Sequence, residues 1–212
     1  MNIPSDTLDI LTNFIRTRVS EANSDGVILG LSGGIDSAVT LSLAVNALGS
    51  EKVAGLVMPF TVTKSVDLAV NHAKSLNVTS KIINISDIVS SYKDSSSLFT
   101  EQLSEGNLHS RIRMSLLYGA GFSSNYLVIG TSNKSELLIG YWTKWGDGGT
   151  DFLPIGDLYK TQIFELGKIL EIPSEILDRK PTAELWPDQT DEEEFGFTYA
   201  ELDTVLYDLE RF

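Results

Sequence analysis

The sequence predicts a single α/β domain over residues 1–212, built on a parallel β-sheet with helices on both faces. Short apolar runs that are typical of buried strands alternate with segments of helical periodicity, the pattern of repeated βαβ units. A Gly-Gly turn joins the first of these runs to the next helical segment. The chain has 212 residues, of which 42% are apolar, enough for one sizeable core.

Four β-branched or apolar runs are expected to form strands, at 27–31, 53–57, 81–85 and 126–129. Helical patterns lie at 6–22, 38–48, 65–76, 110–118, 158–170 and 198–209. The Ser-rich, polar stretch 92–105 predicts a loop. Ligands of an open parallel sheet bind beyond the carboxyl ends of its strands, so we expect the site near residues 32, 58–59, 86–87 and 131.

The balance of charge narrows the range of partners. Sixteen Lys and Arg residues face 29 Asp and Glu residues, which gives a formal net charge of -13. A general nucleic-acid binder needs a basic surface and is therefore disfavoured. An acidic protein that handles phosphates should concentrate a few cations locally or recruit a divalent metal. No apolar run is long enough to cross a membrane.

Cysteine is absent from the sequence. Disulfides, thiolate nucleophiles and cysteine-ligated zinc are therefore excluded. The absence fits a reducing compartment, and residues 1–20 do not show the pattern of a signal peptide. We therefore expect a cytoplasmic protein.

A candidate phosphate loop, Ser-Gly-Gly-Ile-Asp-Ser, occupies residues 32–37 between a strand and a helix. Gly33 and Gly34 allow the backbone to approach an anion closely, and the amides of the next helical turn favour negative charge. Asp36 would repel a phosphate, so we expect it to hold Mg²⁺ against the phosphates instead. The alternative is an ordinary turn in which Asp36 or Ser37 caps the helix. Neither G-x-x-x-x-G-K-[ST] nor G-x-G-x-x-G follows this strand.

Several residues that often carry chemistry are interpreted here as structural. His72 lies in a surface-helix pattern, and no metal-ligand spacing joins it to His109. Trp186 is interpreted as a packing residue. The acidic run 191–194 is interpreted as a solvated segment or a helix start.

The loop at 32–37 resembles the pyrophosphate-binding signature of the N-type ATP pyrophosphatases, which cleave ATP between its α- and β-phosphates. Further segments resemble those of NAD synthetases and follow in the same order over residues 26–210. They are G-N-L-H-S-R-I-R-M at 106–114, G-T-S-N-K-S-E at 130–136, T-K-W-G-D-G-G-T-D at 143–151, L-Y-K-T at 158–161, P-T-A-E-L at 181–185 and D-Q-T-D-E at 188–192.

The resemblance implies a Rossmann-like sheet of the adenine nucleotide alpha-hydrolase type and assigns the site residue by residue. Mg²⁺ is assigned to Asp36 and Glu136. Deamido-NAD is assigned to Arg111, Lys144 and Asp151, and catalytic roles to Asp151, which would orient or deprotonate ammonia, and Lys160. The residues assigned to ATP are Gly30, Leu31, Ser32, Gly33, Gly34, Ile35, Asp36, Ser37, Thr131, Lys160 and Thr182.

The chemistry of these side chains agrees with the assignment, although each alone has an ordinary interpretation. A guanidinium such as that of Arg111 binds phosphate or carboxylate with two hydrogen bonds, but it also suits a solvated helix face. Lys144 stands between two tryptophans and could reach an anion beside an aromatic wall, or be a plain loop lysine. A lysine near a helix start, such as Lys160, opposes the helix dipole and so favours a role facing a ligand. The joint pattern carries the assignment.

The resemblance implies a ligase that forms a C–N bond. It would amidate deamido-NAD (nicotinate adenine dinucleotide) with ammonia and release NAD, AMP and pyrophosphate through an NAD-adenylate, the last step of NAD biosynthesis. Since the sequence has no cysteine and no room for a glutaminase domain, we expect it to use free or delivered ammonia.

The resemblance also implies a homodimer and a basic C-terminal tail, which is absent here because the sequence ends at Arg211-Phe212. Two alternatives stay open at this point. One is another N-type ATP pyrophosphatase, such as a tRNA-modifying enzyme or an amidotransferase synthetase. The other is a non-catalytic nucleotide-binding module.

Overall fold

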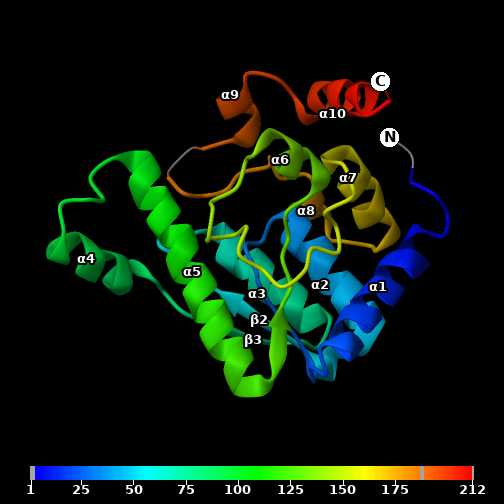
Figure 1. Ribbon diagram of the computed structural model, residues 1–212, viewed down its shortest axis with the longest axis horizontal. Coiled ribbons are helices and arrows are strands. Elements are labelled where there is room, and N and C mark those ends of the chain that lie inside the picture. The colour runs from blue at the N-terminus through cyan, green and yellow to red at the C-terminus, as the bar shows by residue number, and fades with distance from the viewer. Residues whose placement is uncertain (1–2, 187–188, 212) are drawn as a thin grey trace.

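A computed structural model describes residues 3–186 and 189–211, and within them it contains one parallel sheet of four strands (Figure 1). The order is β3-β2-β1-β4. The strands are β1 (Gly26–Gly30), β2 (Val53–Val57), β3 (Thr79–Ile82) and β4 (Tyr126–Val128). Val27 of β1 lies opposite Val53 on one side and Leu127 on the other. The predicted fold class is confirmed.

Helices follow the strands in the expected order, and a short 3₁₀ turn at Ser50–Lys52 leads into β2. None of those in the described parts of the chain has both the length and the apolar character that a bilayer crossing requires. Their bounds are α1 (Thr7–Glu21), α2 (Ile35–Leu48), α3 (Lys64–Ser75), α4 (Ser86–Ser95), α5 (Gln102–Ser124), α6 (Lys134–Ile139), α7 (Lys160–Ile169), α8 (Ser174–Leu177), α9 (Asp191–Phe195) and α10 (Tyr199–Leu209).

The central strands β1 and β2 are buried on both faces, because their alternate residues point to opposite sides and helices cover each side. Val27 and Leu29 pack into a large cluster with α1, α2, α3 and α7, whereas Ile28 packs into a second cluster with α4 and α5. This double burial explains why the strands read as nearly continuous apolar runs in the sequence. It also leaves the carboxyl ends of the strands as the place where polar groups can meet.

The structure corrects the loop that we expected at 92–105. Helix α4 continues to Ser95 and α5 already begins at Gln102. The polar composition misled because α4 buries only Val89 among the residues of its own length, and α5 buries its core-facing side through Leu108 and Ile112. Ser95 and Ser104 belong to these helices, and Ser96 and Ser97 lie in the short connection between them.

Two smaller expectations also need correction. The third strand begins at Thr79, earlier than expected, although the amides of Ile83 and Ile85 still bond to the carbonyls of Val57 and Pro59. His72 is buried rather than on a surface helix face, and its Nε2 lies 3.2 Å from the carbonyl of Ala38. α3 therefore presents this side to α2.

The strand order creates a crevice at the carboxyl ends. β1 is flanked by β2 on one side and β4 on the other, so the loops that leave β1 and β4 separate at this point. Such a topological switch point is where open α/β sheets bind their ligands. The candidate phosphate loop follows β1 and the 130–136 segment follows β4, so the fold brings these two motifs face to face.

Helix α10 lies across α6 and α7 at the top of Figure 1 and holds the two helices together. Its Asp203 is fully buried. The carboxylate accepts hydrogen bonds from the Ser135 hydroxyl and from the Thr161 amide at 2.8 Å. Both donors lie in the first turns of their helices, where the helix dipole favours a negative charge.

We expect Asp203→Ala to lower the free energy of unfolding by about 3 kcal/mol, because it leaves buried hydrogen-bond donors at two helix starts without an acceptor. Asp208→Ala on the same helix is the control, since Asp208 is exposed and its substitution should change stability by less than about 0.5 kcal/mol. Urea unfolding followed by circular dichroism measures both. Equal effects of the two substitutions would contradict the role given to Asp203.

Candidate active site

The loop at residues 32–37 closes on itself and leaves helix amides free at its mouth. Gly33 has φ +76°, and a Cβ atom there would lie 2.3 Å from the backbone oxygen of Ser65, so only glycine fits. The Ser37 hydroxyl donates to the carbonyl of Gly34 and lies 3.1 Å from the Ser32 hydroxyl. No side chain caps the N-terminus of α2, so its first amides can receive an anion.

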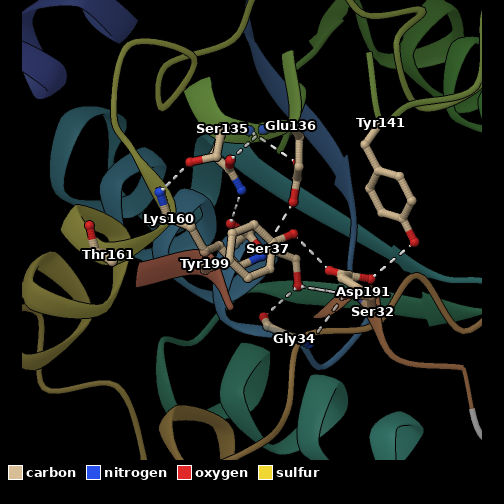
Figure 2. A network of polar contacts seen from close by, with 12 residues as sticks. Ser32, Gly34, Ser37, Ser135, Glu136, Tyr141, Lys160, Thr161, Asp191 and Tyr199 are labelled. Atoms are coloured by element: carbon tan, nitrogen blue, oxygen red, sulfur yellow. Dashed lines mark hydrogen bonds and ion pairs between the residues drawn. The ribbon is translucent and has the colours of Figure 1, made fainter. Parts of the chain in front are cut away.

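A buried ammonium group ties the loop to the two segments beyond it (Figure 2). Lys160, the first residue of α7, is only 2% exposed. Its Nζ lies 2.7 Å from Asp36 Oδ2 and 3.3 Å from Glu136 Oε1. The two carboxylates predicted to hold a metal therefore face a common cation, and their oxygens lie no further apart than these two distances together allow.

Asn133 orients both carboxylates and was not singled out from the sequence. Its amide nitrogen donates to Asp36 Oδ1 at 3.0 Å, and its side-chain oxygen accepts from the backbone of Glu136 at 3.1 Å. The Glu136 carboxylate in turn accepts from the backbone N–H of Asn133, which completes a capping box at the start of α6. The Asn-x-x-Glu spacing is a helix-start signal that could have identified Asn133.

Asp191 corrects the interpretation of the run at 191–194 as solvated. The run is a helix start, as proposed, but Asp191 itself is buried and accepts a hydrogen bond from the Tyr199 hydroxyl at 2.9 Å. The Lys160 ammonium lies 4.8 Å from the centre of the Tyr199 ring. The α9–α10 segment thus closes the charged cluster from above.

The electrostatics of the cluster favour an additional cation. Burial raises the pKa of Glu136 to about 7, an effect that Lys160 opposes and Asp36 reinforces. Burial also raises the pKa of Asp191. For Lys160, burial opposes the charged form, but Asp36 and Glu136 outweigh it and raise the pKa. One ammonium faces three acidic groups, which is the environment that attracts a divalent ion.

The side chains present fit a hard metal ion whose ligands come partly from the protein and partly from a bound substrate. Asp36 and Glu136 supply carboxylate oxygens, the ligands that Mg²⁺ prefers. Across residues 3–186 and 189–211, no three Asp, Glu or His side chains are grouped closely enough to cage an ion by themselves. Mg²⁺ commonly uses one or two carboxylates together with phosphate oxygens and water, so the pair matches that binding mode.

These groups line a cavity of about 1140 Å³ at the carboxyl ends of β1, β2 and β4. The strand-end residues Ser32, Met58 and Thr131 line it as expected, but residues 86–87 do not. Trp186, interpreted as a packing residue, also lines it. The predicted ATP and metal residues in its wall are Gly30, Leu31, Ser32, Gly34, Ile35, Asp36, Ser37, Thr131, Glu136, Lys160 and Thr182.

The three residues predicted to bind the second substrate lie apart from this wall. Arg111 donates through Nε to the carbonyl of Lys144 at 3.2 Å, so these two are neighbours. The Asp151 carboxylate accepts from the Tyr118 hydroxyl at 3.1 Å and from the Val128 amide at 2.7 Å. Among the described residues, a hydrogen bond therefore joins Arg111 with Lys144, and no hydrogen bond or ion pair joins Asp151 to either.

The 143–151 segment docks onto α5 through hydrogen bonds between the two motifs. The Ser110 hydroxyl donates to Asp147 at 2.6 Å, and the Thr143 hydroxyl donates to Asn107 at 2.7 Å. Gly146 is required because a Cβ atom there would lie 2.4 Å from the Ser110 hydroxyl oxygen. Lys144 then lies over the Trp145 ring, 5.4 Å from its centre, as an exposed cation beside an aromatic surface.

Similarity to known proteins shows which family this chain belongs to. The family described as NAD synthase matches residues 7–211. The chain belongs to the NAD synthase family. A similar curated relative is the NH(3)-dependent NAD(+) synthetase of Archaeoglobus fulgidus, 53% identical over 204 residues, which are 95% of this chain and 82% of the relative. The Thermococcus sibiricus enzyme of the same name is 48% identical over 94% of this chain and 78% of its own length.

Solved structures of NAD synthases and a related synthetase share the fold closely. The NMN synthetase of Francisella tularensis superposes with a TM-score of 0.92 at 38% identity, covering 98% of this chain and 87% of that one. The NH3-dependent NAD synthetase of Campylobacter jejuni, in complex with nitrate, gives a TM-score of 0.85 at 38% identity, with 97% and 83% covered.

His109 provides a pH test of the packing around this NAD synthase cavity. It is 2% exposed, stacks on Phe60 with ring centres 4.3 Å apart, and neither ring nitrogen has a hydrogen-bond partner. Burial and the nearby Arg113 charge lower its pKa to about 4, against 6.5 in an unfolded chain. The stability that this neutral ring contributes is therefore complete above pH 6.5 and is lost as the pH falls toward 4.

The free energy of unfolding should fall between pH 7.5 and pH 4 in both the wild type and His109→Gln. We expect the fall to be smaller in His109→Gln, by up to about 3 kcal/mol, because this variant lacks the buried imidazole. Urea titrations at a series of pH values measure the difference. His72, whose pKa burial also lowers, is present in both proteins and cancels in the comparison. Parallel pH profiles would mean that His109 is solvated in the folded protein.

Proposed function

We propose that this chain is an ammonia-dependent NAD synthetase. The observation that carries the proposal is the meeting of a phosphate loop with Asp36, Glu136 and Lys160 in one cavity of an NAD synthase family member. Its substrates would be ATP, deamido-NAD and ammonia. The relatives from A. fulgidus and T. sibiricus, which carry this activity in their names, cover nearly the whole chain. Neither a different ATP pyrophosphatase nor a non-catalytic module is favoured by any of these similarities.

In this proposal the ATP phosphates lie on residues 32–37, where the free amides of α2 and its dipole bind anions. Asp36 and Glu136 would hold Mg²⁺, which supplies neutralisation of the charge that develops on pyrophosphate. Lys160 keeps the two carboxylates together and turned toward the phosphates. Thr131 and Thr182 lie in the cavity wall and would contact ATP.

The second substrate would bind where the 143–151 segment meets α5. Arg111 and Lys144 place two cations on adjacent positions, suited to the pyrophosphate or carboxylate of deamido-NAD. Asp151 lies beside Tyr118, further along α5, and would orient or deprotonate the ammonium. Its carboxylate is already oriented by Tyr118 and the Val128 amide, which is the preorganisation that a proton acceptor needs.

The proposed reaction needs no protein nucleophile. The nicotinate carboxylate attacks the α-phosphorus of ATP, the bond to the β-phosphate oxygen breaks, and pyrophosphate leaves. Ammonia then attacks the acyl carbon, the bond to the AMP oxygen breaks, and a proton passes to a base such as Asp151. Positioning and electrostatic stabilisation would supply the catalysis.

A mononucleotide substrate is the second candidate, since the similar F. tularensis structure is of an NMN synthetase. The chemistry would be the same amidation on nicotinate mononucleotide. The higher identity to the enzymes named for NAD favours the dinucleotide. The homodimer and the cytoplasmic location stay predictions; the exposed Phe122 on α5 is compatible with a subunit contact.

The assay is NAD formation from deamido-NAD, ammonium and Mg·ATP, with one AMP released per NAD. We expect Asp36→Asn to lower kcat at least about 100-fold, because it removes one of two metal carboxylates and half of the Lys160 pairing. Asp208→Asn, at an exposed position of α10, is the control for lost charge. Activity of Asp36→Asn near the wild-type rate would overturn the metal assignment, and faster turnover of nicotinate mononucleotide would select the second candidate.

Arg111→Ala tests the separation of the two substrate regions. We expect the KM for deamido-NAD to rise about tenfold or more through loss of a charge-assisted contact, while the KM for ATP changes less than about twofold. Initial rates with each substrate varied in turn measure this. A matching rise in both constants would place Arg111 at the ATP phosphates or in the packing of the 143–151 segment.

A further inference from the structure

Arg179 holds a position at the phosphate loop that the family resemblance did not assign. It follows α8 and extends back to the loop, where its Nη1 donates to the carbonyl of Gly33 at 3.1 Å. Its Nη2 is paired with the carboxylate of Glu184. The guanidinium therefore lies one residue away from the first turn of α2, whose amides face the cavity.

The other cations in the cavity wall are less suited to this place. Lys160 is held between Asp36 and Glu136, and Arg113 is bound through Nε to the carbonyl of Met58 at 3.0 Å. Lys180 is exposed. Among the lining cations in the described chain, Arg179 is the one that donates a side-chain hydrogen bond to a backbone carbonyl of the phosphate loop, whereas Lys160 contacts the loop through the Asp36 carboxylate.

Glu184, the partner of this guanidinium, is itself held beside the loop by further contacts. Its second oxygen accepts from the Ser65 hydroxyl at 2.9 Å, and its amide donates to the Thr182 hydroxyl at 3.1 Å. Its φ is +48°, a conformation that a residue other than glycine keeps only where its contacts hold it. These contacts fix the 182–184 turn against the loop.

The pair is weak enough to exchange. The side chains of Arg179 and Glu184 are 24% and 35% exposed, and ion pairs that reach solvent change an equilibrium by less than about tenfold. A phosphate offers the same fork of oxygens with more charge, and it would also lie on the α2 amides. Polyphosphate should therefore compete with the Glu184 carboxylate for the guanidinium.

We propose that Arg179 is a polyphosphate-binding residue of this cavity, and that Glu184 holds its guanidinium at the phosphate loop until the β- and γ-phosphates of ATP take the place of the carboxylate. The proposal rests on ATP being a substrate, as proposed above. It assigns Arg179 to the leaving pyrophosphate and not to the AMP portion of the nucleotide.

Calorimetric binding of three probes tests the proposal: Mg·ATP, Mg·pyrophosphate and AMP. We expect Arg179→Ala to weaken Mg·ATP and Mg·pyrophosphate about tenfold or more, and AMP less than about twofold. Glu184→Gln should bind Mg·ATP as tightly as the wild type or more tightly, because the competing carboxylate is gone. Arg18→Ala is the matched control, since Arg18 pairs with Glu21 on the surface of α1 and should change none of the three affinities.

Equal weakening of AMP and Mg·ATP in Arg179→Ala would overturn the proposal and make the residue a structural tie. Weakening by Glu184→Gln as large as that by Arg179→Ala would also overturn it. If the alanine variant does not fold, Arg179→Lys carries the test, with an intermediate loss expected for the two polyphosphates because lysine keeps the charge without the fork. Should the wild type bind AMP but neither polyphosphate, the function proposed above fails together with this inference.

Discussion

The site depends on the contact of the Lys160 ammonium with Asp36 and Glu136. These carboxylates lie in the first turns of α2 and α6, the helices that follow β1 and β4, and the lysine comes from α7, 124 residues beyond Asp36 and 24 beyond Glu136. Burying these charges costs solvation free energy, and only their mutual attraction and further hydrogen bonds offset that cost. A purely structural core would use apolar residues here. Retaining charge at this point is understandable if a cationic ligand shares the carboxylates when substrate is bound.

Around this contact, the fold fixes each charged group through its backbone. Asn133 caps α6 and binds Asp36, while Asp203 of α10 accepts from Ser135 and from the start of α7. The Lys160 amide also donates to the Ser135 hydroxyl at 2.9 Å. The starts of α6 and α7 are thereby joined to each other and to α10, so the charged cluster is built on helices that these hydrogen bonds hold together.

The features that the sequence predicted correctly are those that depend on residues close together in the chain. Apolar runs located β1, β2 and β4, and the paired glycines located the turn before α2 because a φ above zero at Gly33 is a local requirement. The resemblance then placed Asp36, Glu136 and Lys160 in one site before their contact was known. Asn133 could have been identified from its capping-box spacing.

The remaining features depend on contacts between distant segments, which periodicity does not encode. The burial of Asp191 follows from α9 and α10 folding back over Lys160, and Arg179 reaches Gly33 across 146 residues. The helical content of 92–105 was missed because the exposed faces of α4 and α5 are polar. The polar composition of this stretch reflects the helix faces that meet water, whereas the buried contacts of these helices determine their backbone conformation.

Two regions emerge from this arrangement, the cavity around the phosphate loop and, beside it, the place where the 143–151 segment docks on α5. The central claim is that Asp36 and Glu136 share a metal that also touches ATP on residues 32–37. A crystal structure with Mn²⁺ and ATP, in which anomalous scattering locates the ion, tests this most directly. The account predicts one Mn²⁺ bound by both carboxylates and by phosphate oxygens lying on the α2 amides. An ion bound elsewhere, or ATP phosphates that leave the loop empty, would contradict it.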